Sequence, residues 1–266
     1  MTNDPIIFNR KRVRLHRERA VRLGGDDFLL KEMAQRVCER LDELNKKFPM
    51  VLDVGAHAGT LAKKLTGRSD IGILVQTDLS YGMLSKASGL RVVADEELIP
   101  FAENSFDMCI TIGSLQWVND LPGALVQIRR VLKPGGAFIA IIPGGETLKE
   151  LRQSFEKAEM EISGGISPRI SPFVDAREVG SLLTRAGFSH PVIDTELLNV
   201  EYEHPLKLLK ELRAMGETNA LIHSQKNLTP CSVVMTMADH YMRNFLNESE
   251  RINATFELVT MTAWRD

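Results

Sequence analysis

Met50-Val-Leu-Asp-Val-Gly-Ala-His-Ala-Gly-Thr60 is the stretch of this 266-residue sequence that decides its fold. An apolar run ends at Asp53, a Gly-x-x-x-Gly turn follows, and the helix-forming residues 61–65 come next. Gly55 and Gly59 let the backbone turn with positive φ and approach a ligand closely, because glycine has no Cβ. The order of strand, glycine loop and helix is typical of a nucleotide-binding unit, although any α/β protein contains similar turns.

Further apolar runs follow, and two of them end in a carboxylate. Residues 71–78 end at Asp78, where a side chain could accept hydrogen bonds from both hydroxyls of a ribose. Plainer roles stay open for these acids: Asp53 as the cap of the following helix, Asp78 as a turn residue and Asp95 as a helix N-cap. The later runs are residues 92–95, 106–113 and 137–142.

Composition excludes several classes of protein. Hydrophobic residues make up 44% of the chain and the net charge is −2, which argues against a disordered chain or a general nucleic-acid binder. No apolar stretch reaches the length of a membrane span, and the N-terminus lacks the apolar core of a signal peptide. The cysteines are far apart and the histidines show no paired spacing, so we expect a cytoplasmic protein with neither disulfides nor a metal site.

The chain divides into three parts. We expect residues 1–47 to form a basic segment and a helix, residues 48–145 the nucleotide-binding core, and residues 146–266 the completion of the sheet with a helical insertion at about 203–250. Residues 191–202 and 254–264 alternate as strands on either side of this insertion. We therefore predict an α/β fold: a Rossmann-like sheet of seven strands with an antiparallel edge hairpin, flanking helices and a helical lid.

The first part of the chain carries a concentrated positive charge. Residues 10–22 contain seven cations against the single acid Glu18. Three interpretations stay open: a solvated helix face, a lid over the cofactor site, or a docking surface for an acidic protein or a lipid headgroup. The cations are Arg10, Lys11, Arg12, Arg14, Arg17, Arg19 and Arg22.

Several segments resemble a known family. Leu132-Lys-Pro-Gly-Gly136 resembles the turn before the fifth strand of class I S-adenosylmethionine-dependent methyltransferases. Ile166-Ser-Pro-Arg-Ile-Ser-Pro-Phe173 and Met215-Gly-Glu-Thr-Asn219 are more specific, and they resemble the methyltransferase-like assembly factor of respiratory complex I in its bacterial form. Its broader relatives are the malonyl-carrier-protein O-methyltransferases of biotin synthesis. The complex I factor is a family that hydroxylates an arginine on an iron–sulfur subunit.

The resemblance implies S-adenosylmethionine (SAM) as the cofactor and suggests two groups of site residues. Trp117 could equally be a packing residue, and Glu217 and Asn219 could be turn formers. No acid or histidine stands in a diagnostic catalytic motif, so the catalytic residue stays unknown. The cofactor group is Asp53, Gly55, His57, Gly59, Asp78, Leu79, Asp95, Glu96 and Ser114. The substrate-pocket group is Phe8, Arg10, Gln116, Trp117, Glu217 and Asn219.

His57 departs from the family pattern, which has glycine at the centre of the loop. Histidine tolerates positive φ better than most residues, so we expect the loop to form. Its side chain either lowers the affinity for the cofactor, or bonds the ligand, or turns to solvent.

Three functional hypotheses follow. The first is a SAM-binding enzyme that methylates or hydroxylates a protein partner, acidic or an iron–sulfur subunit, in complex I assembly. The second is an O-methyltransferase acting on a malonyl thioester, and the third is a non-catalytic assembly protein. Methyl transfer needs mainly alignment and exclusion of water, whereas hydroxylation needs an oxidant, usually with iron, for which no ligand set is visible. We expect no nucleic-acid partner, and peripheral association with a membrane stays open.

Overall fold

The computed structural model describes residues 6–24, 27–224 and 228–266, and it is built on a seven-stranded sheet. The strand order is β3-β2-β1-β4-β5-β7-β6, in which β7 runs antiparallel to both of its neighbours and the other pairs are parallel. The predicted fold class is confirmed. The strands are β1 (Phe48–Val54), β2 (Ile71–Asp78), β3 (Leu90–Val93), β4 (Phe106–Ile112), β5 (Leu132–Pro143), β6 (Ser189–Tyr202) and β7 (Ile252–Trp264).

Helices cover both faces of this sheet because its central strands are apolar on both sides. Along β5, Ile139 faces a cluster formed with α2, α6, α8 and α9, while Phe138 faces a cluster formed with α5 and α7. The longer helices are α1 (Arg10–Leu23), α2 (Phe28–Leu44), α5 (Leu121–Val131), α6 (Lys149–Ser163), α7 (Ala176–Arg185), α8 (Pro205–Met215) and α9 (Cys231–Phe245). The short ones are α3 (Thr60–Leu65), α4 (Tyr81–Leu84) and the 3₁₀ turn η1 (Leu115–Trp117).

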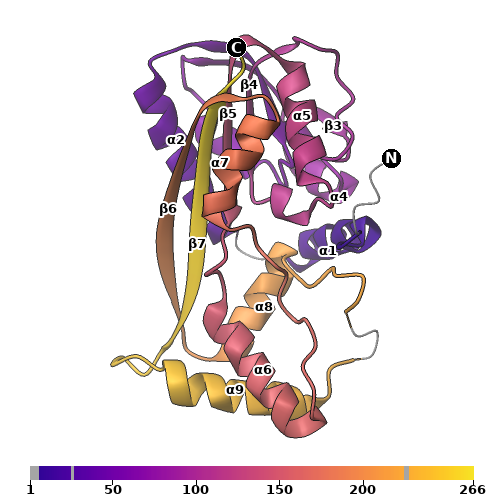
Figure 1. The fold of residues 1–266 in the computed structure, drawn as a ribbon, viewed down its shortest axis with the longest axis vertical. Helices are drawn as coiled ribbons and strands as arrows, with labels where there is room; N and C mark the ends of the chain where they lie inside the picture. Colours follow the sequence, from indigo (N-terminus) through magenta and orange to yellow (C-terminus); the bar gives the residue numbers. More distant parts are fainter. Residues whose placement is uncertain (1–5, 25–26, 225–227) are drawn as a thin grey trace.

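The antiparallel hairpin of β6 and β7 extends beyond the parallel strands, and α6, α8 and α9 gather at its far end (Figure 1). Helices α8 and α9 lie between β6 and β7 in the sequence, where the insertion was expected. Helix α1 lies between this helical end and the parallel part of the sheet. The basic segment is therefore placed against the carboxyl ends of the parallel strands, where open α/β sheets bind ligands.

Two boundaries differ from the sequence prediction. The third strand, expected over residues 92–95, is β3 (Leu90–Val93), so Asp95 lies two residues beyond its end. The segment 132–136, expected as a turn before the fifth strand, is already part of β5, because Leu132 pairs with Phe106 of β4. The turn character survives as an irregularity: the register shifts between Phe106 and Met108, and Gly135 has a φ of 72°.

Candidate functional site

The glycine loop between β1 and α3 turns through three positive φ angles. Gly55, His57 and Gly59 have φ values of 76°, 51° and 75°. His57 is buried: its backbone N–H donates to Oδ2 of Asp78 at 3.0 Å, and its ring Nε2 lies 3.1 Å from the carbonyl oxygen of Gly113. Burial lowers the pKa of His57, so the neutral ring donates through Nε2. The solvent-facing alternative is therefore wrong, and the ring lies inside the loop.

Ser114, just after β4, packs against this loop. A Cβ on Gly55 would lie 2.1 Å from Oγ of Ser114, so only glycine fits there. The Ser114 hydroxyl donates to Oε1 of Glu96 and accepts a hydrogen bond of 2.9 Å from Arg17. Ser114 thus joins the glycine loop to a buried charged cluster.

That cluster consists of Asp78, Glu96 and Arg17, and all three are at most 2% exposed. Nη1 of Arg17 lies 3.1 Å from Oδ2 of Asp78 and 2.9 Å from Oε1 of Glu96. Oδ1 of Asp78 also accepts from the backbone N–H of Ser80, so the residue acts as a turn acid as well. Burial alone would raise the pKa of Glu96, but the charges of Arg17 and Arg10 outweigh it and lower that pKa to about 2.

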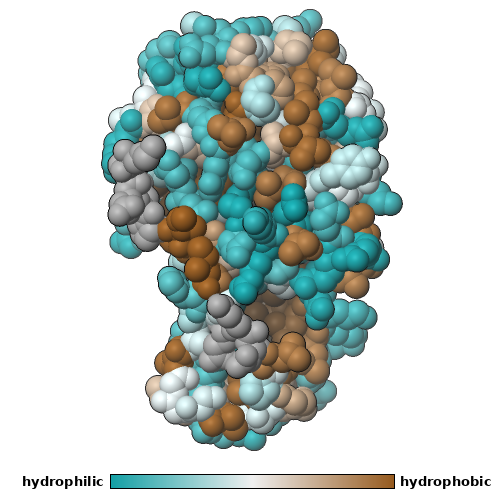
Figure 2. All heavy atoms as spheres, turned by 90° about the vertical axis from the view of Figure 1, so that its right-hand side faces the viewer, coloured by the Kyte–Doolittle hydropathy of each residue, from teal (hydrophilic) through white to brown (hydrophobic). Residues whose placement is uncertain are grey.

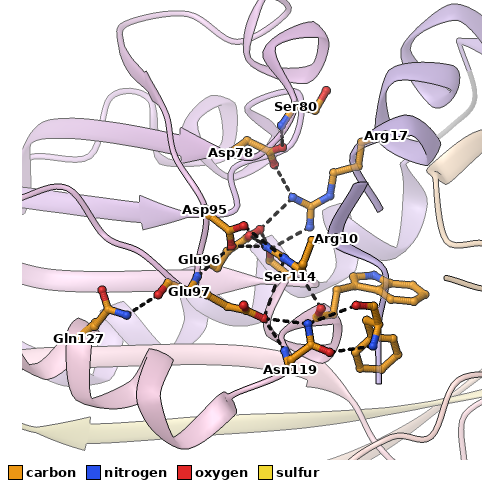
Figure 3. Close-up of polar contacts among 12 residues, drawn as sticks. Arg10, Arg17, Asp78, Ser80, Asp95, Glu96, Glu97, Ser114, Asn119 and Gln127 are labelled. Carbon is orange, nitrogen blue, oxygen red and sulfur yellow. Dashed lines mark hydrogen bonds and ion pairs between the residues drawn. The ribbon is translucent and has the colours of Figure 1, made fainter. Parts of the chain in front are cut away.

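Arg10 closes the outer side of the same cluster (Figure 3). Its Nη2 pairs with Oδ1 of Asp95 at 2.6 Å and with Oε2 of Glu96, and its Nη1 donates to the carbonyl oxygen of Trp117 at 3.0 Å. Asp95 also accepts from the backbone N–H of Glu97. The acids expected at the cofactor, Asp78, Asp95 and Glu96, are therefore held by two arginines of α1.

Two further contacts fix α1 and the segment before it. Oε1 of Glu18 accepts from the Ser80 hydroxyl at 2.8 Å and from the backbone N–H of Gly82 at 3.0 Å. Oδ1 of Asn119 accepts from the backbone N–H groups of Ile7 and Phe8 at 2.8 and 2.7 Å. The α1 segment thus lies on the site as a lid, one of the three interpretations that its sequence left open.

Arg17 is the residue that sequence reasoning missed, because it was counted with the cations expected to face a partner. Its position carried a signal. Arg10, Val13, Arg17 and Ala20 recur at helical spacing, and Val13, Arg17 and Ala20 are the buried residues of α1. An arginine on the apolar stripe of a helix indicates a buried acidic partner.

Asp53, at the end of β1, is fully buried without a partner. Neither of its carboxylate oxygens has a hydrogen-bond partner among the described residues, and the N-cap position of α3 is Gly59, so Asp53 does not cap that helix. Burial and the neighbouring charge of Asp78 raise the pKa of Asp53 to about 8. Asp53 is therefore a protonated acid at neutral pH, beside the charged cluster.

A cavity of about 830 Å³ adjoins the cluster on the other side of α1. Four residues of the predicted substrate pocket line it: Gln116, Trp117, Glu217 and Asn219. The other two predicted residues do not. Arg10 is held by the acids, and Phe8 packs edge-on against Trp117, so neither is part of the wall. Figure 2 shows an apolar hollow between the two ends of the molecule on this side.

The remaining predicted residues have structural contacts. Leu79 packs against the small cluster of Phe8, Val13 and Trp117. Asn219 donates to the carbonyl oxygen of Pro168 at 2.8 Å, which ties the 166–173 segment to the loop after α8.

Glu217 is the only acid among the described residues of the cavity wall. Its Oε2 accepts a hydrogen bond of 3.0 Å from Nε1 of Trp117. Burial raises the pKa of Glu217 to about 7, against the opposing charge of Arg17. Trp117 therefore has a polar partner beyond packing, and Glu217 can hold or release a proton near neutral pH.

The wall near Glu217 is rich in arginine. In the described part of the chain, four of these arginines have no carboxylate within ion-pair distance: Arg12, Arg19, Arg22 and Arg213. Burial and the charges of Arg213 and Arg22 lower the pKa of Arg19. The cavity thus combines one acid with an excess of positive charge.

The described ranges contain no group of three or more His, Cys, Asp or Glu side chains that could hold a metal ion. None of their helices is long and apolar enough to cross a membrane.

Comparison with known proteins finds relatives that agree with the fold described above. A family model described as a methyltransferase domain matches residues 52–140. The mouse protein named arginine-hydroxylase NDUFAF5, mitochondrial, is 38% identical over 97% of this chain and 77% of its own length. The malonyl-[acyl-carrier protein] O-methyltransferase 1 of Coxiella burnetii is 34% identical over 86% of this chain and 78% of its own.

The fold is also found among solved structures. A structure described as a putative methyltransferase from Bacillus halodurans superposes with a TM-score of 0.60 at 14% identity, over 86% of this chain and 97% of that one. At this identity the match shows the fold alone. Together with the relatives it confirms the resemblance that the sequence motifs indicated.

Proposed function

The chain belongs to the family of methyltransferase-like enzymes that contains the NDUFAF5 arginine hydroxylases and the malonyl-carrier-protein O-methyltransferases, and from this we propose that it modifies an arginine of a protein partner during complex I assembly. One observation carries the proposal: the 38% identity to the mouse protein extends over nearly the whole chain. The matched region therefore includes the residues around the cavity as well as the sheet. The NDUFAF5 relatives are named as mitochondrial. For this chain we propose that the protein is located in the cytoplasm.

We propose SAM as the ligand at the carboxyl ends of β1, β2 and β4, a place that we call the cofactor cleft and that the side chains of α1 fill in this structure. The residues fit in kind: Gly55 and Gly59 permit the positive φ angles of the loop, and Asp78 stands at the end of β2, where a ribose is held. Asp53 adds two buried oxygens that lack a partner in the described chain. When bound, SAM supplies an activated methyl group. In the conformation described, however, Asp78 and Glu96 are engaged by Arg17.

Glu217 suits the recognition of a guanidinium group. It lines the cavity, it carries no ion pair shorter than 4 Å in the described chain, and Trp117 orients it through one oxygen. An entering arginine would hold Glu217 as a carboxylate, since an adjacent cation lowers the pKa of an acid. The aromatic face of Trp117 could add a cation–π contact. The apolar part of the cavity wall, which includes Met33, Leu151 and Phe155, would help to exclude water from the acceptor.

A second candidate follows from the arginines of the same wall. Arg12, Arg19, Arg22 and Arg213 favour an anionic substrate, and a malonyl thioester carries a carboxylate. The methyl acceptor would then be that carboxylate, which needs alignment but no general base. The charge pattern supports this alternative, whereas the extent of identity supports the first.

Mass spectrometry distinguishes the two. Iron–sulfur subunits and the acyl carrier protein would be isolated from cells with and without the gene. We expect an arginine in which a C–H bond has become C–OH only when the gene is present; molecular oxygen would be the oxidant, and an external two-electron reductant would carry its second oxygen atom to water. The hydroxylation should be lost with Glu217→Gln and kept with the exposed matched control Glu248→Gln. A methyl group on the malonyl thioester instead would establish the alternative, and no change on either protein would favour a non-catalytic assembly role.

A further inference from the structure

We propose that α1 is a displaceable closure of the cofactor cleft and that Arg17 decides whether the cleft is open. The cofactor can bind only after the guanidinium of Arg17 has left Asp78 and Glu96. The inference rests on the proposed function, since it takes SAM as the ligand of that cleft.

The first step is a competition for the same oxygen atoms. Arg17 occupies Oδ2 of Asp78 and Oε1 of Glu96, and it donates a third hydrogen bond to Ser114. A ribose that donates both hydroxyls to Asp78 needs two acceptor sites, but the N–H of Ser80 leaves only one on Oδ1, and the N–H of His57 and the guanidinium of Arg17 fill both on Oδ2. The guanidinium is the one of these donors that belongs to a side chain able to move, so it is the group that a ligand would replace.

The second step is that α1 is held by charge more than by apolar contact. Its buried side chains are Val13, Arg17 and Ala20, and two small apolar groups supply little hydrophobic stabilisation. The rest of the attachment is polar. Arg10 and Glu18 hold α1 on the cleft side, and three side chains of its other face bond to residues 218–224: Arg12, His16 and Arg19. A ligand that takes over the carboxylates removes the arginine contacts on the cleft side, so α1 can turn about the contacts that remain.

The third step is that the exposed residues of α1 do not add a second anchor. Lys11 and Arg14 are exposed on the outer face. An acidic partner docking on that face would change the equilibrium between closed and open cleft, which links partner binding to cofactor access. The chain would then bind cofactor weakly when alone.

Calorimetric titration with S-adenosylhomocysteine tests this. The apparent affinity equals the affinity of the open form multiplied by the fraction of protein that is open. If the closed form dominates, a change that abolishes it should therefore raise the apparent affinity by about tenfold or more. We therefore expect Arg17→Gln to bind at least about tenfold more tightly than wild type. Glu18→Gln, which loosens α1 without touching the acids, should bind a few-fold more tightly. Arg14→Gln, an exposed change on the same helix, should match wild type.

Hydrogen exchange on the unmodified protein gives a second test that needs no variant to fold. Amides of residues 10–23 should exchange faster when S-adenosylhomocysteine is added. Two results would overturn the closure but leave SAM as the ligand. One is tight binding by wild type with weaker binding by both Arg17→Gln and Glu18→Gln; the other is slower exchange of the α1 amides when S-adenosylhomocysteine is added. No binding by any of the proteins at millimolar concentration would overturn the SAM assignment itself.

Discussion

The cleft and the cavity lie on two sides of α1, and they differ in charge pairing: charged side chains are paired in the cleft and mostly unpaired among the described residues of the cavity wall. In the cleft, Asp78, Asp95 and Glu96 are each paired with Arg17 or Arg10. In the cavity, among the described residues, four arginines of the wall have no carboxylate within ion-pair distance (Arg12, Arg19, Arg22 and Arg213), and Glu217 has no cation within that distance. Paired buried charges fix a structure, whereas unpaired charges at a cavity wall are available to a ligand.

One helix supplies both environments because its faces alternate with the helical period. Arg10 and Arg17 are seven residues apart and share the face on the cleft, while Arg12 and Arg19, also seven apart, line the cavity. A small rotation or a lift of α1 would therefore affect the two sites together. The comparison can be tested from each side.

The largest effect should come from breaking the paired side. Removing one partner of a buried ion pair commonly costs about 3–5 kcal/mol. We expect Arg17→Gln to lower the free energy of unfolding by only about 2 kcal/mol, because a displaced α1 would let water reach Asp78 and Glu96. Urea denaturation measures this, with Arg14→Gln as the control. A loss of the full amount would mean that α1 stays in place.

An intermediate effect should appear in the pH dependence of stability, with opposite signs for the two sites. The pKa of Glu96 falls from 4.5 to about 2, so its contribution is present above pH 4.5 and is lost as the pH falls toward 2. The pKa of Glu217 rises from 4.5 to about 7, so stability is lost as the pH rises from 4.5 through 7.

We therefore expect Glu217→Gln to stabilise the protein at pH 8 by about 1–2 kcal/mol and to have little effect at pH 4. Glu96→Gln should destabilise it at pH 7 and have less effect near pH 2. Thermal denaturation across this pH range would record both profiles. Parallel profiles for the two variants would show that the charge contrast between cleft and cavity is wrong.

The smallest effect on stability should come from the unpaired arginines. Arg19→Gln should change the free energy of unfolding by no more than about 0.5 kcal/mol, since a crowded cation with only a hydroxyl partner contributes little. Its effect should appear in binding instead. Association with an anionic ligand of the cavity should slow and depend less on salt, as stopped-flow measurements at two ionic strengths would show. Unchanged salt dependence would exclude Arg19 from the recognition of that ligand.

The sequence predicted correctly those strands and loops that can be recognised from the order of neighbouring residues. The apolar run before Asp53, the glycines at Gly55 and Gly59, and the alternation along residues 191–202 identify strands and a loop without knowledge of their neighbours. Motif resemblance placed Trp117 and Glu217 in the pocket, and the structure shows both in the cavity wall, joined by a hydrogen bond. It did not reveal that Arg17 points inward.

The sequence by itself determined the order of strands and helices, the family, and the acids at the ends of the strands, because each depends on the spacing of neighbouring residues. Only the tertiary structure decided which arginines meet those acids and which face the cavity. Arg17 and Asp78 are 61 positions apart, and Trp117 and Glu217 are 100 apart. Pairings of that kind depend on how α1 and α8 pack against the sheet, and burial then sets the pKa of each group that they bring together.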